Sequence, residues 1–318
     1  MSGLPVVDIA APRAATVLGR ALEEIGFAYV TGHGVPPAVI DAAFAASRAF
    51  HESSTELKRA LAINKWHRGF MELATSTVIT SSVVRVTRPN LSESLMIMHE
   101  VAAGEVGPPL QGPNQWPEWL PGFRAAVDAY RTSLERVART VIRLIAEALD
   151  LPATAVDRYF ARPTTFLRLL RYPPHPAEAG DDQFGSAPHT DYGIITLLAQ
   201  DESGGLQVRA RNGGWIDAEP MADGFLLNVA DMLARWTNDR FVSTPHRVIN
   251  NRRSDNAGGR DRYSLPYFFD TDMDAVIECL PTCAGPGNPP RYDPVRYGDY
   301  LMERLDKNYD YRRRPAAE

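Results

Sequence analysis

Beyond residue 161 the chain breaks into short β-type runs separated by turn clusters, and this pattern constrains the fold more than any other feature. The clusters DESGG, RNGG and SDNAGG combine glycine with Asp, Asn and Ser, the residues that tight turns favour. Many short strands at regular spacing are typical of a sandwich or barrel, a class that includes the jelly roll. The runs are TFLRLLRY, GIITLLAQ, LQVRA, WIDAEP, GFLLNVA, HRVIN, YSLPYFF and AVIEC.

The front half of the chain is dominated instead by helical spacing of apolar residues. Its last helical stretch is the strongest, because one apolar stripe runs between charged residues. The pattern predicts helices over 18–25, 37–62 and 123–151, short strands over 5–9 and 27–30, and irregular or weakly stranded surface over 63–115. We therefore expect a mainly β fold with flanking helices that share one core.

Charge and cysteine content exclude several classes of protein. The formal net charge is −5, so no global basic field attracts nucleic acid or an anionic membrane. No stretch approaches the roughly 18 apolar residues of a membrane helix, and the N-terminus lacks the pattern of a signal peptide. Cys279 and Cys283 lack partners for a disulfide framework or a zinc site. We expect a cytoplasmic monomer or weak homo-oligomer with two free thiols.

A histidine and an aspartate two positions apart, His189 and Asp191, directly precede an apolar run. In a strand such residues point to the same face, so both side chains could bind one metal ion. His246 opens another β-type run and is the best candidate for a third ligand. Two histidines and one carboxylate suit a non-haem Fe(II) oxygenase. Polar groups without any metal satisfy the same pattern, so the spacing alone leaves both interpretations open.

A second polar pair follows in RYSLPYF, where Arg262 and Ser264 share a strand face. The planar guanidinium offers two parallel N–H groups to a carboxylate, and the hydroxyl adds one more donor. Together with the metal pattern, this pair predicts a carboxylate clamp beside a metal centre. Asn228 and Asp231 in LLNVADML are better explained by a structural role in a turn.

The sequence resembles the iron(II)- and 2-oxoglutarate-dependent dioxygenases of the isopenicillin N synthase-like family. The resemblance covers nearly the whole chain, with blocks in the order of that family. At the front these are PVVDI, EEIGFAYVTGHGVP and RPNLSESLMI. At the back they are LRLLRYPP, PHTDYGIITLLAQDESGGLQV, LLNVADMLARWTNDRFVSTPHRVIN, RYSLPYFF, CLPTC and PPRYDPVRYGDYL.

The resemblance implies a double-stranded β-helix, or jelly-roll, core with a helical N-terminal region. The implied division is a helix-rich region over 1–160 that packs on the core, the core itself over 161–280, and a C-terminal helical segment and tail over 281–318. It further implies an oxygenase that uses Fe(II), 2-oxoglutarate and O2 and releases succinate and CO2. Such an enzyme would hydroxylate, desaturate or cyclise a small organic substrate.

The resemblance also assigns residues. It implies that His189, Asp191 and His246 hold the iron, while Arg262 and Ser264 bind the distant carboxylate of 2-oxoglutarate. Tyr172 matches a position whose hydroxyl reaches the carboxylate of the cosubstrate or the substrate. Many members carry asparagine two residues before that tyrosine, where this chain has Leu170. This departure leaves open whether 2-oxoglutarate is obligatory.

The irregular stretch 63–100 is the predicted lid of the substrate pocket, because loops on a rigid scaffold carry specificity. The arginines there could bind a substrate carboxylate or lie on the surface, and the apolar side chains could belong to the core instead. The candidates are Phe70, Arg85, Arg88, Met96, Met98 and His99, with Phe268 from the strand after Arg262.

Two alternatives remain at this point. One is an Fe(II) oxidase like isopenicillin N synthase itself, in which the Arg-x-Ser pair binds substrate and no 2-oxoglutarate is used, and Leu170 favours this alternative. The other is a jelly-roll protein that binds a small molecule without catalysis. The intact set of metal and clamp residues argues against the second, although a fold alone never establishes a function.

Overall fold

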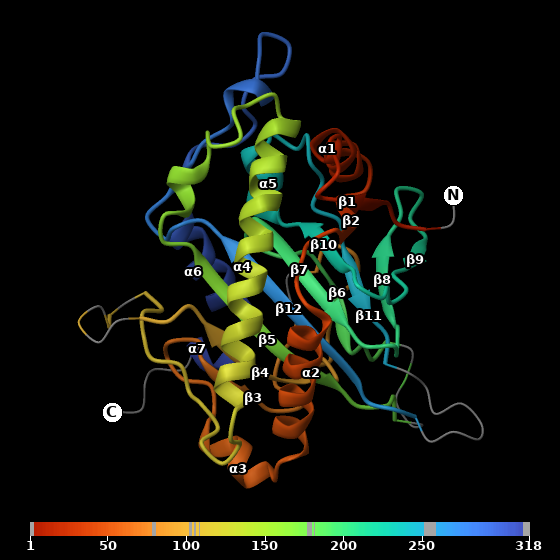
Figure 1. Ribbon diagram of the computed structural model, residues 1–318, viewed down its shortest axis with the longest axis vertical. Helices are drawn as coiled ribbons and strands as arrows, with labels where there is room; N and C mark the ends of the chain where they lie inside the picture. Colours follow the sequence, from red (N-terminus) through yellow and green to blue (C-terminus); the bar gives the residue numbers. More distant parts are fainter. Residues whose placement is uncertain are drawn as a thin grey trace.

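Two β-sheets face each other, and helices cover the outer face of the larger sheet, in the computed structural model of the chain (Figure 1). The structure describes residues 3–77, 81–101, 104, 106–107, 109–176, 180, 182–250 and 259–313. The larger sheet has eight strands, of which only the β1–β2 pair is parallel. Their spatial order is β1 (Val6–Asp8), β2 (Phe27–Thr31), β10 (Phe225–Val229), β7 (Ile195–Gln200), β12 (Arg262–Asp270), β5 (Thr164–Tyr172), β4 (Glu93–Met98) and β3 (Gly69–Met71).

The smaller sheet has four strands and is antiparallel throughout. Its order is β6 (Ser186–His189), β11 (His246–Val248), β8 (Leu206–Arg209) and β9 (Trp215–Asp217), and a separate pair joins β13 (Val276–Ile277) to β14 (Val295–Arg296). All eight β-type runs predicted beyond residue 161 contain a strand. Apolar residues of both sheets, including Tyr172, Leu206, Leu226 and Val248, form one buried cluster, so the space between the sheets is the interior of the fold.

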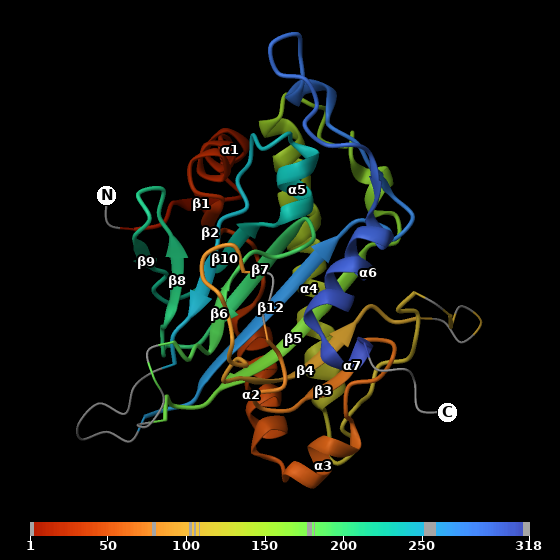
Figure 2. The same ribbon diagram turned by 180° about the vertical axis from the view of Figure 1, so that it is seen from behind.

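Helices α1 (Ala14–Glu24), α2 (Pro37–Glu52) and α4 (Phe123–Ala148) pack on one another across one face of the larger sheet. Figure 2 shows α6 (Tyr297–Asn308) and α7 (Asp310–Arg313) on the opposite face. The predicted stripe of α4 is buried, including Val127, Tyr130, Leu134 and Val141. The remaining short helices are α3 (Thr55–Ala60), α5 (Asp231–Trp236) and the 3-10 turns η2 (Asp157–Phe160) and η3 (Pro281–Cys283). No helix in the described ranges is long and apolar enough to cross a membrane.

Two predictions of secondary structure were wrong. The helix expected over 37–62 is two helices, because Ser53 is extended and Ser54 caps α3 by accepting a hydrogen bond from the backbone of Leu57. The stretch 63–115 contains β3 and β4, and every residue of β4 is buried. A strand buried on both faces has no alternation of apolar and polar residues, so periodicity cannot identify it.

The core joins both halves of the chain, as expected. One hydrophobic cluster includes Leu18 of α1, Leu95 of β4, Phe225 of β10 and Leu305 of α6. Four strands from the front half continue the larger sheet on either side of the strands from the back half. The division at residues 160 and 280 stays a prediction. Cys279 and Cys283 are both free, as predicted.

Candidate active site

The side chains of His189, Asp191 and His246 converge at one end of the space between the two sheets. One ligand atom from each lies within 4.8 Å of the others. Nε2 of His189 is 3.8 Å, and Nε2 of His246 is 3.9 Å, from Oδ1 of Asp191. The histidines meet because β6 and β11 are adjacent antiparallel strands whose register pairs His246 with His189. The three residues predicted as metal ligands therefore form a cluster that could hold one ion.

The reason given for the proximity of His189 and Asp191 was wrong. His189 is the last residue of β6, and Asp191 lies beyond the strand, where the chain bends before β7. The backbone carbonyl of Asp191 accepts a hydrogen bond of 2.8 Å from the N–H of Asp231, the first residue of α5. Asp191 is thus positioned by a contact with a distant helix instead of the alternation of a strand.

Each of the three side chains is oriented by further hydrogen bonds. Nδ1 of His189 donates to the carbonyl of Ala187 at 2.8 Å, and Nδ1 of His246 lies 3.3 Å from the carbonyl of Thr244. These bonds leave Nε2 of each ring unprotonated and facing Asp191, the tautomer that a metal requires. Oδ2 of Asp191 accepts from Thr196 Oγ1 at 2.5 Å and from Asn228 Nδ2 at 2.8 Å.

The contact with Asn228 corrects the role that the sequence predicted for it. Asn228 lies in β10, not in a turn, and its amide fixes the carboxylate of Asp191. Sequence reasoning missed it, although a polar residue inside the buried run GFLLNVA is a recognisable signal. Asp231 begins α5 and accepts hydrogen bonds from Ser243 and Arg304, so its role is structural, as predicted.

The electrostatics of the cluster favour metal binding at neutral pH. Burial, and then the electrostatic effect of the neighbouring His246, lower the pKa of His189 to about 4. Burial alone would raise the pKa of Asp191, but the neighbouring histidines and the bonds from Thr196 and Asn228 lower it overall. A neutral imidazole beside a carboxylate is the state in which these groups bind a metal. Two histidines and one carboxylate are the donor set of non-haem Fe(II).

The metal cluster borders a cavity between the sheets, here called the clamp cavity, which is also lined by Tyr172, Arg262 and Ser264. Arg262 is 1% exposed, and its Nε donates to the Gly204 carbonyl at 2.6 Å while Nη2 donates to Gln200 Oε1 at 3.0 Å. The Tyr172 ring centroid lies 4.9 Å from the guanidinium carbon. The structure thus brings together all six residues expected to bind the metal and the cosubstrate.

The hydrogen bonding of the Arg262 guanidinium indicates whether the clamp cavity suits a carboxylate. Nη1 of Arg262 is buried and has no hydrogen-bond partner among the described residues. Burial lowers the pKa of Arg262, although Tyr172 and Asp201 partly offset this effect. A buried, unpaired N–H of a cation is costly, and an anionic acceptor in the cavity would remove that cost. The cavity therefore fits a ligand with a carboxylate at its Arg262 end.

A second cavity adjoins the first and is here called the aromatic cavity. Its walls include Phe166, Tyr192, Phe268 and Tyr309, and both cavities are lined by Arg168, Ser186, His189, Asp191 and Phe268. One face of β5 links them, because Phe166, Arg168, Leu170 and Tyr172 alternate along that strand. The aromatic cavity is therefore the space next to the metal cluster that a substrate could occupy.

The structure separates the predicted pocket residues into two groups. Phe268 and Met96 line the aromatic cavity. Phe70 and Met98 are buried in the core, and His99 is hydrogen-bonded to Gln111. Arg85 and Arg88 are exposed, and Arg88 pairs with Asp182. Within the described part of the chain, none of these last five lines either cavity.

The C-terminal segment forms a wall of the aromatic cavity, which sequence reasoning did not anticipate. Leu301, Leu305, Asn308 and Tyr309 all line it. Two hydrogen bonds hold this segment in place. Nδ1 of His67 is hydrogen-bonded to the Tyr311 hydroxyl, and Asn308 donates to the Tyr192 hydroxyl at 2.7 Å. Burial, helped by nearby arginines, holds the pKa of His67 well below its usual value, so the ring is neutral and accepts from Tyr311.

Replacing Gly193 with alanine is expected to weaken Fe(II) binding by at least about tenfold, because the added carbon would displace the bend that carries Asp191. A Cβ there would lie 1.7 Å from Oδ1 of Asp270. That carboxylate cannot yield easily, since it accepts bonds of 2.6 Å from both Ile194 N and the Tyr297 hydroxyl. Bound iron is measured after anaerobic reconstitution. Gly285→Ala, where the added carbon meets open space, is the control, and equal iron content in both variants would contradict the prediction.

Comparison with known proteins identifies the family. The model of the 2OG-Fe(II) oxygenase superfamily matches residues 163–271, and that of the non-haem dioxygenase in morphine synthesis N-terminal region matches residues 4–119. The 2-oxoglutarate-Fe(II) type oxidoreductase hxnY of Emericella nidulans is 34% identical over 89% of this chain and 81% of its own. A homoarginine-6-hydroxylase of Glycine max is 33% identical over 92% of this chain and 88% of its own.

A solved structure agrees with both the fold and the cosubstrate. A full-length protein of Neurospora crassa, crystallised in complex with alpha-KG, which is 2-oxoglutarate, superposes with a TM-score of 0.83 at 28% identity over 95% of each chain. The jelly-roll prediction is confirmed, and neither the oxidase without 2-oxoglutarate nor the non-catalytic binder is favoured. The chain belongs to the 2-oxoglutarate- and Fe(II)-dependent oxygenases of the isopenicillin N synthase-like superfamily and is an oxidoreductase that uses Fe(II), 2-oxoglutarate and O2.

Proposed function

We propose that His189, Asp191 and His246 hold the Fe(II) of this oxygenase and that the clamp cavity beside them holds 2-oxoglutarate. One observation carries this proposal. Nη1 of Arg262 is buried and has no hydrogen-bond partner within the described residues, and Arg262 lines the same cavity as the three converging side chains. Arg262 and Ser264 bind the distant carboxylate of the cosubstrate, with Tyr172 beside them. Leu170 stands opposite Ser264 in the strand register and supplies an apolar wall.

The residues around the metal cluster have distinct parts in this chemistry. With its cofactors bound, the enzyme would use one O2 to convert 2-oxoglutarate to succinate and CO2 and to oxidise the substrate. The histidines and Asp191 position the metal, and Thr196 and Asn228 hold the carboxylate of Asp191 in place. Leu198 of β7 lines the clamp cavity, and Ile195 and Leu197 on the opposite face of that strand are buried in the core, so water is excluded from the interior.

The lining of the aromatic cavity supports a small, planar substrate with a hydrogen-bond acceptor. Phe166, Tyr192 and Phe268 offer ring faces for stacking or edge contacts. Nε of Arg168 is buried and unpaired within the described residues, while its Nη2 donates to Ser94 at 3.0 Å. The related Neurospora crassa protein has been solved with thymine, a planar ring that carries carbonyl acceptors. We infer that Arg168 donates to a carbonyl or carboxylate of the substrate.

Replacing Arg168 with glutamine should raise the KM for the substrate by about 10-fold to 100-fold, because a hydrogen bond to a charged donor is lost. The KM for the cosubstrate should change little, since 2-oxoglutarate binds at the Arg262 end. Steady-state kinetics with each of the two molecules varied in turn separate the two constants. Arg88→Gln, at an exposed arginine of the predicted lid, is the control. A rise confined to the KM for the cosubstrate would contradict the assignment.

The proposed function is tested by anaerobic reconstitution with Fe(II) followed by titration with 2-oxoglutarate. A visible absorption band should develop as the keto acid binds the metal. A screen of small ring compounds, carboxylic acids and amino acids should then reveal a substrate that triggers stoichiometric release of succinate. Protein that binds iron but neither develops the band nor consumes 2-oxoglutarate would refute the proposal.

We also propose a cytoplasmic enzyme that acts as a monomer or weak homo-oligomer and does not bind nucleic acid. The net charge of −5 and the two free cysteines support this proposal.

A further inference from the structure

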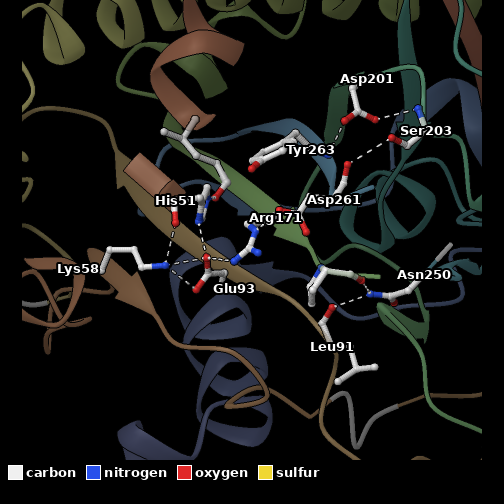
Figure 3. Close-up of polar contacts among 12 residues, drawn as sticks. His51, Lys58, Leu91, Glu93, Arg171, Asp201, Ser203, Asn250, Asp261 and Tyr263 are labelled. Carbon is white, nitrogen blue, oxygen red and sulfur yellow. Dashed lines mark hydrogen bonds and ion pairs between the residues drawn. The ribbon is translucent and has the colours of Figure 1, made fainter. Parts of the chain in front are cut away.

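A buried cluster of charged side chains lies on the face of β4 and β5 that points away from the clamp cavity. At its centre Glu93 of β4, which is 6% exposed, is hydrogen-bonded to His51, Lys58 and Arg171 (Figure 3). Lys58 Nζ lies 2.9 Å from Oε1 and 3.1 Å from Oε2 of Glu93, His51 Nδ1 lies 3.0 Å from Oε1, and Arg171 Nη1 lies 3.1 Å from Oε1. Neither the metal cluster nor the two cavities beside it account for this concentration of charge.

The charges in the cluster are well defined. Burial alone would raise the pKa of Glu93, but His51 and Lys58 together lower it to about 2, so the group is a carboxylate. Nε2 of His51 contacts the Leu169 carbonyl at 2.9 Å, so both ring nitrogens of His51 lie next to oxygen atoms. The carboxylate of Glu93 therefore holds Arg171 within an ordered network that includes Lys58 and His51.

Arg171 extends this network to the beginning of β12. Its Nε donates to Oδ2 of Asp261 at 2.7 Å, so one guanidinium bridges Glu93 and Asp261 across the sheet. Asp261 directly precedes Arg262, and Arg171 directly precedes Tyr172. Because neighbouring residues of a strand point to opposite faces, the ion pair lies behind the two residues that line the clamp cavity.

A second set of contacts joins the beginning of β12 to the loop that follows β7. Asp201 Oδ2 accepts from the N–H of Tyr263 at 2.7 Å, and Ser203 Oγ contacts the Asp261 carbonyl at 3.4 Å. The carbonyl of Gly204 in this loop accepts directly from Nε of Arg262. The carboxylate of Asp261 therefore joins Arg171 to the backbone that carries Arg262, and that backbone is joined through the Asp261 carbonyl and the Tyr263 N–H to the loop that holds the guanidinium.

We propose that the chain Glu93–Arg171–Asp261 positions Arg262 for binding the distant carboxylate of 2-oxoglutarate. Asp261 and Arg171 are positioning residues that act through Arg262, and this inference rests on the proposed role of Arg262 as the clamp. A bidentate clamp depends on direction, so a small shift of the guanidinium weakens it. A network with only a structural role would change stability and leave the affinity for 2-oxoglutarate unaltered.

The test replaces Asp261 with alanine and measures the dissociation constant of 2-oxoglutarate on the anaerobic Fe(II) protein. We expect affinity to fall by about fivefold while kcat at saturating 2-oxoglutarate and the KM for the substrate stay within about twofold. Asp261→Asn keeps an acceptor for Arg171 and should lose less. The control is Glu23→Ala, which removes a pair with Arg240 of the same 2.7 Å length and similar exposure.

A double-mutant cycle separates failure of this inference from failure of the proposed function. If Asp261 acts through Arg262, Asp261→Ala should add nothing to the loss caused by Arg262→Gln. Unchanged affinity in Asp261→Ala, beside a large loss in Arg262→Gln, would overturn the positioning role alone. An additive loss in the double variant would overturn it as well. Unchanged affinity in Arg262→Gln would overturn the proposed clamp itself.

Discussion

Replacing His189 with alanine is expected to abolish turnover, a loss of at least about a thousandfold, while the fold remains intact. Under the proposed function His189 is one of three iron ligands, and its Nε2 can face the metal because Nδ1 donates to the backbone. Because only two ligand side chains would remain, the metal would bind weakly and exchange readily. Bound iron measured after reconstitution, together with succinate release, reports the loss.

The structural cost of this change should be small. The side chain of His189 is 23% exposed, donates to the Ala187 carbonyl and packs its ring against that of His246 at a centroid distance of 4.3 Å. Thermal unfolding followed by circular dichroism should therefore resemble that of the unaltered protein. His33→Ala removes a histidine that contacts the Asp223 carbonyl and the Phe225 ring instead, and it should retain iron and activity. Full turnover in His189→Ala would show that the metal lies elsewhere.

Arg262→Gln is expected to raise the KM for the cosubstrate 2-oxoglutarate by about a hundredfold, because a buried charge pair loses one partner. The guanidinium lies wholly inside the protein, and its Nη1 lacks an acceptor among the residues that the structure describes. The substrate, which binds in the aromatic cavity under the same proposal, should keep its KM. Initial rates at varied 2-oxoglutarate and a direct titration on the Fe(II) protein both measure the effect.

The lysine variant distinguishes charge from geometry at this position. Arg262→Lys keeps the positive charge but cannot present two parallel N–H groups or bridge Gly204 and Gln200 as the guanidinium does. We expect its KM for the cosubstrate to lie between those of the unaltered protein and Arg262→Gln. Equal values of this constant in all three proteins would mean that the distant carboxylate binds elsewhere.

Local patterns of sequence were sufficient for much of the fold and for naming candidate site residues that the structure brings together. The β-type runs beyond residue 161 each contain a strand, and α4 follows its apolar stripe. The residues His189, Asp191, His246, Arg262 and Ser264 meet as expected. These predictions succeeded because strand alternation, turn residues and ligand chemistry are properties of single residues and their near neighbours.

Predictions failed where a residue's role depends on segments far apart in the chain. The run around Met98 gave no signal for β4, which lies between β3 and β5 in the sheet and is buried at every residue. Phe70 and Met98 pack into the core, while Arg168 reaches the boundary of both cavities. A C-terminal helical segment was expected, but not that α6 forms a wall of the aromatic cavity beside the metal cluster.

The sequence by itself determined the type of strands, the family and the residues able to hold iron and bind a carboxylate. Only the tertiary structure decided how Asp191 is held, which side chains line the substrate space, and how Glu93 reaches Asp261 through Arg171. The physical reason is that metal binding and carboxylate recognition require particular side-chain atoms. The sequence states which residues carry those atoms. The lining of a cavity and a chain of ion pairs depend on the distances between segments of the folded chain. Only the packing of sheets and helices determines those distances.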